Sequence, residues 1–382
     1  MKIEDINSTV SESKVSVEAV SAEVDIQSAS SRSSGLPSNG AAQNRHSPFK
    51  VVHDAHKDDI HALVKLQDGT FLTGSKDAEI VKWSSSGECI QKMFTRPPNK
   101  PINFRYWVTS LEPLNGSDFA AGFRDGTIRI FKKGRISTQF KNRTADGVVC
   151  KERNKDRINC FLRGREDGLL FSGSATCFQL WDIETGEVSF SHQVSSNDWV
   201  YSMRRLPGAA SGDESRLVIV VGSCLELWCS SSTNDGASDP ATWSSRSRLL
   251  SEGPSRVPGT RPHISSSEFM GSTTSVNACF DSVIRCVDTE THQPLKVLSG
   301  HRGRVWSIAP IDENVFASGA DDCSIRLWDI RSWSCVKIYG GHPGRVSNVL
   351  SLDPTVLVGA SCPQNPRLEG GAQLSFWDVR GS

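Results

Sequence analysis

The sequence predicts an all-β chain built from serial short strands that recur in repeated units, and three observations support this prediction. From Phe49 onward, short runs of alternating apolar and polar residues recur, each bounded by Gly, Asp, Asn or Ser. Such runs are typical of short strands joined by tight turns. Helical periodicity is hard to find in the same region. The third observation is a pattern of polar and aromatic residues that occurs twice at identical spacing, which indicates an internal repeat.

The repeated pattern consists of a histidine, a hydroxyl residue, an aspartate and a tryptophan. The two copies are His56, Thr73, Asp77 and Trp83, and His301, Ser318, Asp322 and Trp328. The intervals are 17, 4 and 6 residues in both copies. Three matching intervals in distant parts of the chain predict two copies of one structural unit.

The second copy lies in a segment, residues 300–331, that reads GHRGRVWSIAPIDENVFASGADDCSIRLWDIR. The Gly-His pair recurs at Gly341-His342, and the Trp-Asp pair recurs at Trp181-Asp182 and Trp377-Asp378. With these motifs the chain resembles the WD-repeat (WD40) family of β-propellers. The resemblance implies an all-β, seven-bladed WD40 β-propeller of about 47 residues per unit over residues 49–380. The third strands of the seven units are expected to end near Trp83, Phe131, Trp181, Trp228, Val287, Trp328 and Trp377.

The two ends of the chain complete the predicted domain organisation. Residues 1–48 are rich in Ser and contain no aromatic residue, so we expect a disordered tail, serving as a solubilising leader, a phosphorylated segment or a secretion or targeting signal. Too few residues follow Trp377 for a fourth strand, so we expect residues 49–53 to complete the last blade and remove its exposed edge. Residues 229–263 are expected to contain a loop insertion with an outer strand near 248–250.

The two four-residue sets allow a catalytic and a structural interpretation. A His, a hydroxyl and an Asp could form a hydrolase triad. In the family that this chain resembles, the same side chains form a structural hydrogen-bond relay, and two copies in different blades favour that role. Other units depart from the pattern, with Ala121 and Phe131 in the second, no matching His in the third, Val287 in the fifth and Gly359 in the seventh.

Composition excludes several classes of function. The chain has 382 residues with 43 basic and 43 acidic side chains, so bulk binding to nucleic acid is not expected. Its longest aliphatic run, Leu217 to Val221, is too short to cross a membrane. The 11 cysteines include no CxxC pair and no secretory signal is evident, so we expect reduced, buried thiols rather than zinc ligands. These features predict a cytoplasmic protein, with the nucleus as an alternative.

Enzyme motifs are missing from the sequence. No phosphate-binding Gly-rich loop, HExxH or nucleophile-elbow GxSxG occurs in a suitable context, so the sequence predicts neither catalysis nor a cofactor or metal. A catalytic site in the central channel would require a cluster of titratable groups with perturbed pKa values.

Partner-binding residues are expected on the top face of the propeller, just before the first strand of each unit. They are Asp59, Trp107, Arg157, Trp199, Arg304 and Arg345. Trp and Arg are enriched in interface hot spots, although both Trp side chains could instead pack between blades. Residues 141–165 carry eight basic and three acidic side chains, which indicates either a solvated loop or a binding site for an acidic or phosphorylated peptide. The loop 361–372 inserts eight residues on the same face.

Two functions follow from these residues. The leading hypothesis is a non-catalytic scaffold that binds a protein or peptide through its top face, with the propeller monomeric within a larger complex. The alternative is a substrate receptor of a cullin-RING ubiquitin ligase. Its signal is the WDxR sequence ending at Arg331 and at Arg380, which resembles the adaptor-docking motif of some WD-repeat proteins.

Overall fold

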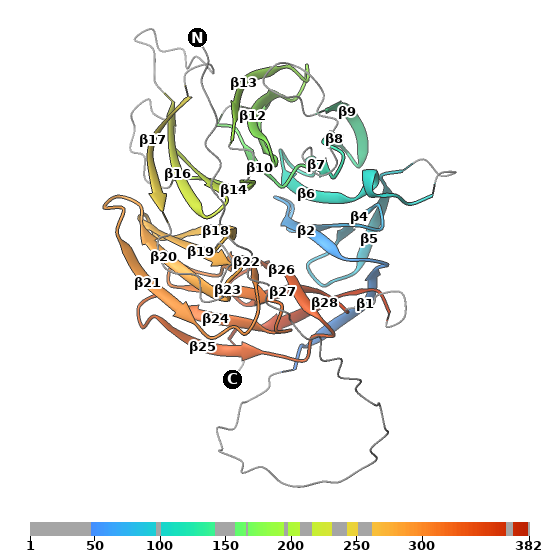
Figure 1. Ribbon diagram of the computed structural model, residues 1–382. Helices are drawn as coiled ribbons and strands as arrows, with labels where there is room; N and C mark the ends of the chain where they lie inside the picture. The colour runs from blue at the N-terminus through green and yellow to red at the C-terminus, as the bar shows by residue number, and fades with distance from the viewer. Residues whose placement is uncertain are drawn as a thin grey trace, which may run out of the picture. The chain divides into compact units, whose positions relative to one another are not determined.

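The computed structural model describes residues 47–96, 101–141, 157–165, 167–194, 198–206, 216–230, 243–250, 262–363 and 370–380. These residues form seven four-stranded antiparallel sheets arranged around a common centre (Figure 1). The sequence-based prediction of an all-β, seven-bladed propeller is therefore confirmed. The tail expected over residues 1–48 lies outside the described residues except for its last two positions. Within the described part of the chain, no helix has the length and apolar character needed to cross a membrane.

In each of the first three blades, the four strands follow one another along the chain from the centre of the propeller outward. Blade 1 contains β2 (Ile60–Lys65), β3 (Phe71–Ser75), β4 (Glu79–Trp83) and β5 (Cys89–Phe94). Blade 2 contains β6 (Val108–Pro113), β7 (Phe119–Phe123), β8 (Thr127–Lys132) and β9 (Arg135–Lys141), and the 3-10 helix η1 (Phe104–Tyr106) precedes it. Blade 3 contains β10 (Cys160–Arg163), β11 (Leu169–Gly173), β12 (Cys177–Asp182) and β13 (Val188–Gln193).

The next three blades repeat the arrangement. Blade 4 contains β14 (Val200–Arg205), β15 (Arg216–Val221), β16 (Cys224–Ser230) and β17 (Trp243–Leu250). Blade 5 contains β18 (Ile264–Met270), β19 (Thr274–Cys279), β20 (Val283–Asp288) and β21 (Pro294–Ser299). Blade 6 contains β22 (Val305–Pro310), β23 (Val315–Ala320), β24 (Ile325–Asp329) and β25 (Ser334–Tyr339).

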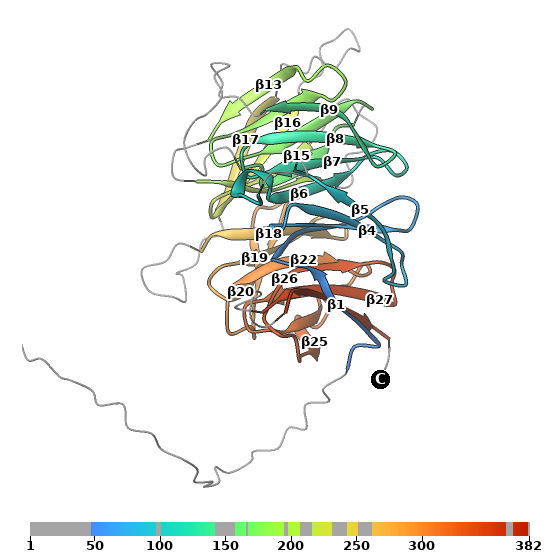
Figure 2. The same ribbon diagram turned by 90° about the vertical axis from the view of Figure 1, so that its right-hand side faces the viewer.

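Blade 7 is built from both ends of the propeller chain. Its strands are β26 (Arg345–Ser351), β27 (Val356–Cys362), β28 (Ala372–Asp378) and β1 (Lys50–His56). β1 pairs antiparallel with β28 in the register Lys50↔Phe376 and Val52↔Leu374, and Figure 2 shows β1 beside the last strands of the chain. This pairing gives β28 a hydrogen-bonded neighbour on each side, so the edge that it would otherwise expose is covered.

The hydrophobic core lies between neighbouring blades. One cluster joins blades 1 and 7 through Phe71, Val358 and Phe376, each fully buried. Glycines on second strands permit this close approach, because a Cβ at Gly74 would lie 2.5 Å from Val108 Cγ1 and one at Gly319 would lie 2.7 Å from Val346 Cγ1. The small residue on one blade therefore makes room for the leading apolar side chain of the next blade's first strand.

A β-bulge recurs near the start of the first strand in blades 1, 2, 4, 5, 6 and 7. The residues at the bulge are His61, Thr109, Tyr201, Ser265, Trp306 and Ser347. A bulge leaves one residue without a ladder partner and redirects its side chain. All six bulge residues line the central channel, so this backbone irregularity determines which side chains the channel presents.

Candidate functional site

The four residues singled out in blade 1 are joined by hydrogen bonds. His56 Nδ1 lies 2.9 Å from Asp77 Oδ2, and His56 Nε2 lies 2.7 Å from Thr73 Oγ1, which accepts a hydrogen bond of 2.8 Å from Trp83 Nε1. Burial would raise the pKa of Asp77, but the hydrogen bond from His56 and its charge lower it overall. The bonds run from an indole donor through a hydroxyl and an imidazole to a carboxylate, which satisfies every buried polar group in the set.

Blade 6 repeats this geometry. His301 Nδ1 lies 3.0 Å from Asp322 Oδ2, His301 Nε2 lies 2.7 Å from Ser318 Oγ, and Trp328 Nε1 donates to the same hydroxyl at 2.8 Å. The hydroxyl residues Thr73 and Ser318 both have an exposed fraction of 0%. A hydroxyl that no substrate can reach cannot act as a nucleophile, so the arrangement supports a structural relay in both blades.

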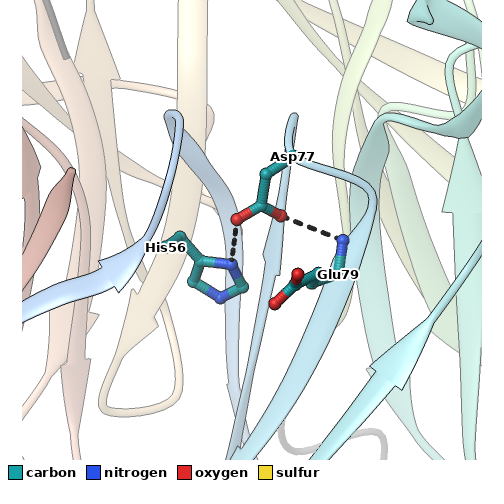
Figure 3. A group of neighbouring side chains, drawn as sticks. All are labelled: His56, Asp77 and Glu79. Carbon is teal, nitrogen blue, oxygen red and sulfur yellow. Dashed lines mark hydrogen bonds and ion pairs between the residues drawn. The ribbon is translucent and has the colours of Figure 1, made fainter. Parts of the chain in front are cut away.

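His56, Asp77 and Glu79 are close enough to resemble a metal site (Figure 3), with one ligand atom from each lying within 4.8 Å of the others. Both nitrogens of His56 are already engaged by Asp77 and Thr73, and the Glu79 backbone N–H donates to Asp77 Oδ1 at 2.9 Å. A metal ion would have to replace the hydrogen bonds that order this turn. The donor set therefore fits the relay better than a cation.

The other blades retain only parts of the relay. In blade 3, Trp181 Nε1 donates to Ser172 Oγ at 2.8 Å. In blade 7, Gly359 replaces the hydroxyl residue. Both ring nitrogens of buried His342 and the Trp377 Nε1 have no hydrogen-bond partner among the described residues. Burial lowers the pKa of His342 to about 4. The seventh blade therefore holds a neutral histidine at physiological pH.

Blade 5 contains a different buried polar pair that the repeat pattern did not reveal. Arg285 Nη1 and Nη2 lie 2.8 and 2.7 Å from the two carboxylate oxygens of Asp281. Both residues are buried, with exposed fractions of 6% and 1%. This two-point ion pair occurs in the blade where Val287 replaces the relay tryptophan. In the sequence, the four-residue interval between Asp281 and Arg285 is the signal that could have indicated this ion pair. Oppositely charged residues at that interval are also common on exposed surfaces.

The central channel has a volume of about 750 Å³ and is lined by the first strands of six blades and, in blade 3, by Arg157 and Asn159 just before β10. Three of the six residues predicted for partner binding line it, namely Arg157, Trp199 and Arg345. Asp59, Trp107 and Arg304 are not among its lining residues. Sequence reasoning selected the residue that precedes the leading apolar residue of each blade's first strand. It thereby missed the bulge residues, which come directly after that apolar residue.

Aromatic side chains form a continuous arc at the channel mouth, from blade 4 to blade 6. The ring-centroid distances are 6.1 Å for Trp199–Tyr201, 6.0 Å for Tyr201–Phe280 and 5.1 Å for Phe280–Trp306. His263 lies 6.2 Å from Phe280 and from Tyr201. Trp306 is fixed by a hydrogen bond of 2.6 Å from its Nε1 to Asp321 Oδ1. We call Trp199, Tyr201, His263, Phe280 and Trp306 the aromatic arc.

Cationic side chains surround the aromatic rings of the mouth. Arg304 lies 5.4 Å from the Phe280 centroid and Arg345 lies 5.7 Å from the Trp306 centroid. In blade 2, Trp107 lies beneath Arg124 at 4.4 Å and Lys76 at 5.3 Å. Trp107 and Trp199 are both half-buried, so each combines packing with an accessible edge.

The basic segment 141–165 does not lie on one face. Arg163 is at the far end of β10 from the channel mouth, where it bonds to Asn115 at 2.6 Å and to Asp167 at 2.5 Å. Arg165 follows it in the same turn. The expectation that the whole segment occupies the top face is wrong for these two residues, because β10 carries the chain to the opposite face. Residues 142–156, and 364–369 of the inserted loop, lie outside the described residues.

The two WDxR arginines follow third strands on the face opposite the channel mouth. Arg331 Nη2 lies 2.9 Å from Asp329 Oδ2, and the Arg380 backbone N–H donates to Asp378 Oδ1 at 2.8 Å. Both side chains are exposed.

A family model described as "WD domain, G-beta repeat" matches residues 292–329. This range begins in the turn before β21, the outer strand of blade 5, and ends with β24 of blade 6. The sequence repeat therefore begins with the outer strand of one blade and ends with the third strand of the next. For the same reason β1, at the start of the propeller, supplies the outer strand of blade 7. Together with the seven-bladed fold, the match supports the WD40-repeat family that the sequence motifs indicate. No curated protein matches the chain.

Proposed function

We propose that this propeller is a non-catalytic scaffold that binds a segment of a partner protein at the channel mouth. WD40 propellers commonly act as protein-interaction scaffolds. The aromatic arc carries the proposal, because half-exposed aromatic rings beside arginines are the side chains that most often anchor protein interfaces.

Among the described residues, the titratable groups in and beside the channel do not form an activated catalytic set. Burial raises the pKa of Glu112 to about 7, but Glu112 is not among the residues that line the channel. The lining residues Arg204 and Glu268 form an ion pair with each other. Burial also raises the pKa of the nearby Cys160 thiol to about 12, so it stays protonated. A buried thiol of this kind is a poor nucleophile.

The test is capture of partner proteins from the native lysate, followed by mass spectrometry. Replacing Trp306 by Ala should abolish capture while leaving the melting temperature unchanged, because Trp306 belongs to none of the buried core clusters. The matched control is Arg331→Ala on the opposite face. Capture that survives Trp306→Ala would contradict the proposed site.

The ligase-receptor function is the second candidate, supported by the exposure of both WDxR arginines. It predicts that Arg331→Ala combined with Arg380→Ala abolishes co-purification of a ligase adaptor. Trp306→Ala would leave adaptor binding intact, so the same pair of variants separates the two functions.

A further inference from the structure

We propose that the channel mouth binds an anionic side chain of the partner segment, a carboxylate or a phosphate ester, with Arg157 as its principal contact. This inference rests on the proposed function and specifies the chemistry of the segment. Arg157 lies three residues before the start of β10 at Cys160 and lines the channel.

The Arg157 side chain is a cation without a partner in the described residues. Its Nε is buried and has no hydrogen-bond acceptor, and no carboxylate lies within ion-pair distance of its guanidinium. Two other sequestered cations among the described residues are paired. Arg285 binds Asp281 at two points, and Arg204 binds Glu268. Burying a charge without a counterion is costly, so an unpaired guanidinium facing a cavity favours an acceptor supplied from outside.

The surroundings of Arg157 increase its attraction for an anion. Burial lowers the pKa of Arg157 to about 10 and the charge of Arg124 adds to this lowering, yet the group stays charged at neutral pH. Lys76 and Arg345 also line the channel, and both bind the same carboxylate, Asp59. Because Lys76 and Arg345 share the single negative charge of Asp59, the channel mouth keeps a net positive charge. Such a concave, partly desolvated site concentrates the field on an entering anion.

The aromatic arc lies beside this cationic site and continues from Trp199 and Tyr201, which line the same channel as Arg157. An anionic residue at Arg157 would place its neighbours in the peptide against these rings. The surface therefore selects a short motif in which an acidic or phosphorylated residue is flanked by apolar residues.

The test uses the full chain and four fluorescent peptide libraries whose fixed central residue is Glu, phosphoserine, Ser or Lys, with apolar residues on both sides. Fluorescence anisotropy should show at least tenfold tighter binding of the Glu or the phosphoserine library than of the Ser and Lys libraries. The Glu and phosphoserine arms identify which anion is preferred. Arg157→Gln should remove this preference, whereas Arg331→Gln, the control at an exposed cation on the opposite face, should retain it.

The outcomes separate this inference from the proposed function. Arg157→Gln should melt at the same temperature as the wild type or higher, because it removes an unpaired buried charge. If all four libraries bind equally and binding is lost in Trp306→Ala, the scaffold function stands and the anion site is refuted. Failure of both anionic libraries to bind, or an undiminished preference in Arg157→Gln, also refutes it.

Discussion

Arg345 Nη2 lies 2.5 Å from Asp59 Oδ2, an ion pair between residues 286 positions apart that joins the last blade to the first. Lys76 donates to the same oxygen. Burial alone would raise the pKa of Asp59, but the hydrogen bond from Lys76 and the charges of Arg345 and Lys76 lower it overall. Arg345 therefore contributes to ring closure as well as to the channel wall.

This pair distinguishes Arg345 from Arg304, although the sequence placed both in one partner-binding set. Arg345→Ala should lower the free energy of unfolding by about 1 kcal/mol, the upper value for a partly exposed pair. Arg304→Ala should leave it unchanged, because the exposed Arg304 side chain contacts the Phe280 ring and has no ion pair among the described residues. Urea unfolding of both variants measures the difference. Equal losses would show that the Asp59 pair adds nothing to closure.

The relay hydroxyls offer a second comparison. Ser318→Ala leaves two buried groups unpaired, His301 Nε2 and Trp328 Nε1, and should cost about 3 kcal/mol. Ser172→Ala leaves only Trp181 Nε1 unpaired and should cost about half as much. Thermal and urea unfolding provide the measurement. A loss for Ser172→Ala as large as that for Ser318→Ala would contradict a relay in which the histidine shares the hydroxyl.

The relay was predictable because it depends on fixed spacing along the chain. His56 and Asp77 are 21 residues apart in a turn geometry that any blade with the same loop lengths repeats. The site at the mouth was less accessible to sequence reasoning. Trp306 enters the channel because a bulge between Val305 and Ser307 redirects it, and no residue type in that segment signals a bulge. The Arg345–Asp59 pair depends on ring closure, which brings together residues from opposite ends of the propeller.

The closing strand gives a third prediction. Removal of residues 1–53 deletes the part of β1 that pairs with Phe376, Ser375 and Leu374, while His56 and its relay remain. The uncovered edge of β28 should then promote aggregation. Removal of residues 1–46, the control, keeps β1 intact. Size-exclusion chromatography should show aggregates for the longer truncation alone, and equal monomer yields from both would refute the closing role of β1.

Stability should decrease as pH falls from 7 to 5, because buried histidines outnumber the buried glutamate that opposes them. Burial lowers the pKa of His342 to about 4 and also lowers those of His61 and His301. Below the unfolded value of 6.5, the unfolded chain binds protons that the folded chain does not, so folding loses free energy. His342 alone accounts for about 2 kcal/mol of this loss by pH 5.

Glu112 acts in the opposite direction. Burial raises its pKa from 4.5 to about 7, so its contribution to stability is present below pH 4.5 and is lost as pH rises through 7. Glu112→Gln removes this opposing slope, and the variant should lose more stability than the wild type between pH 7 and pH 5. Urea unfolding at both pH values tests this directly. A variant whose pH dependence matches that of the wild type would show that Glu112 is not held protonated by burial in the folded protein.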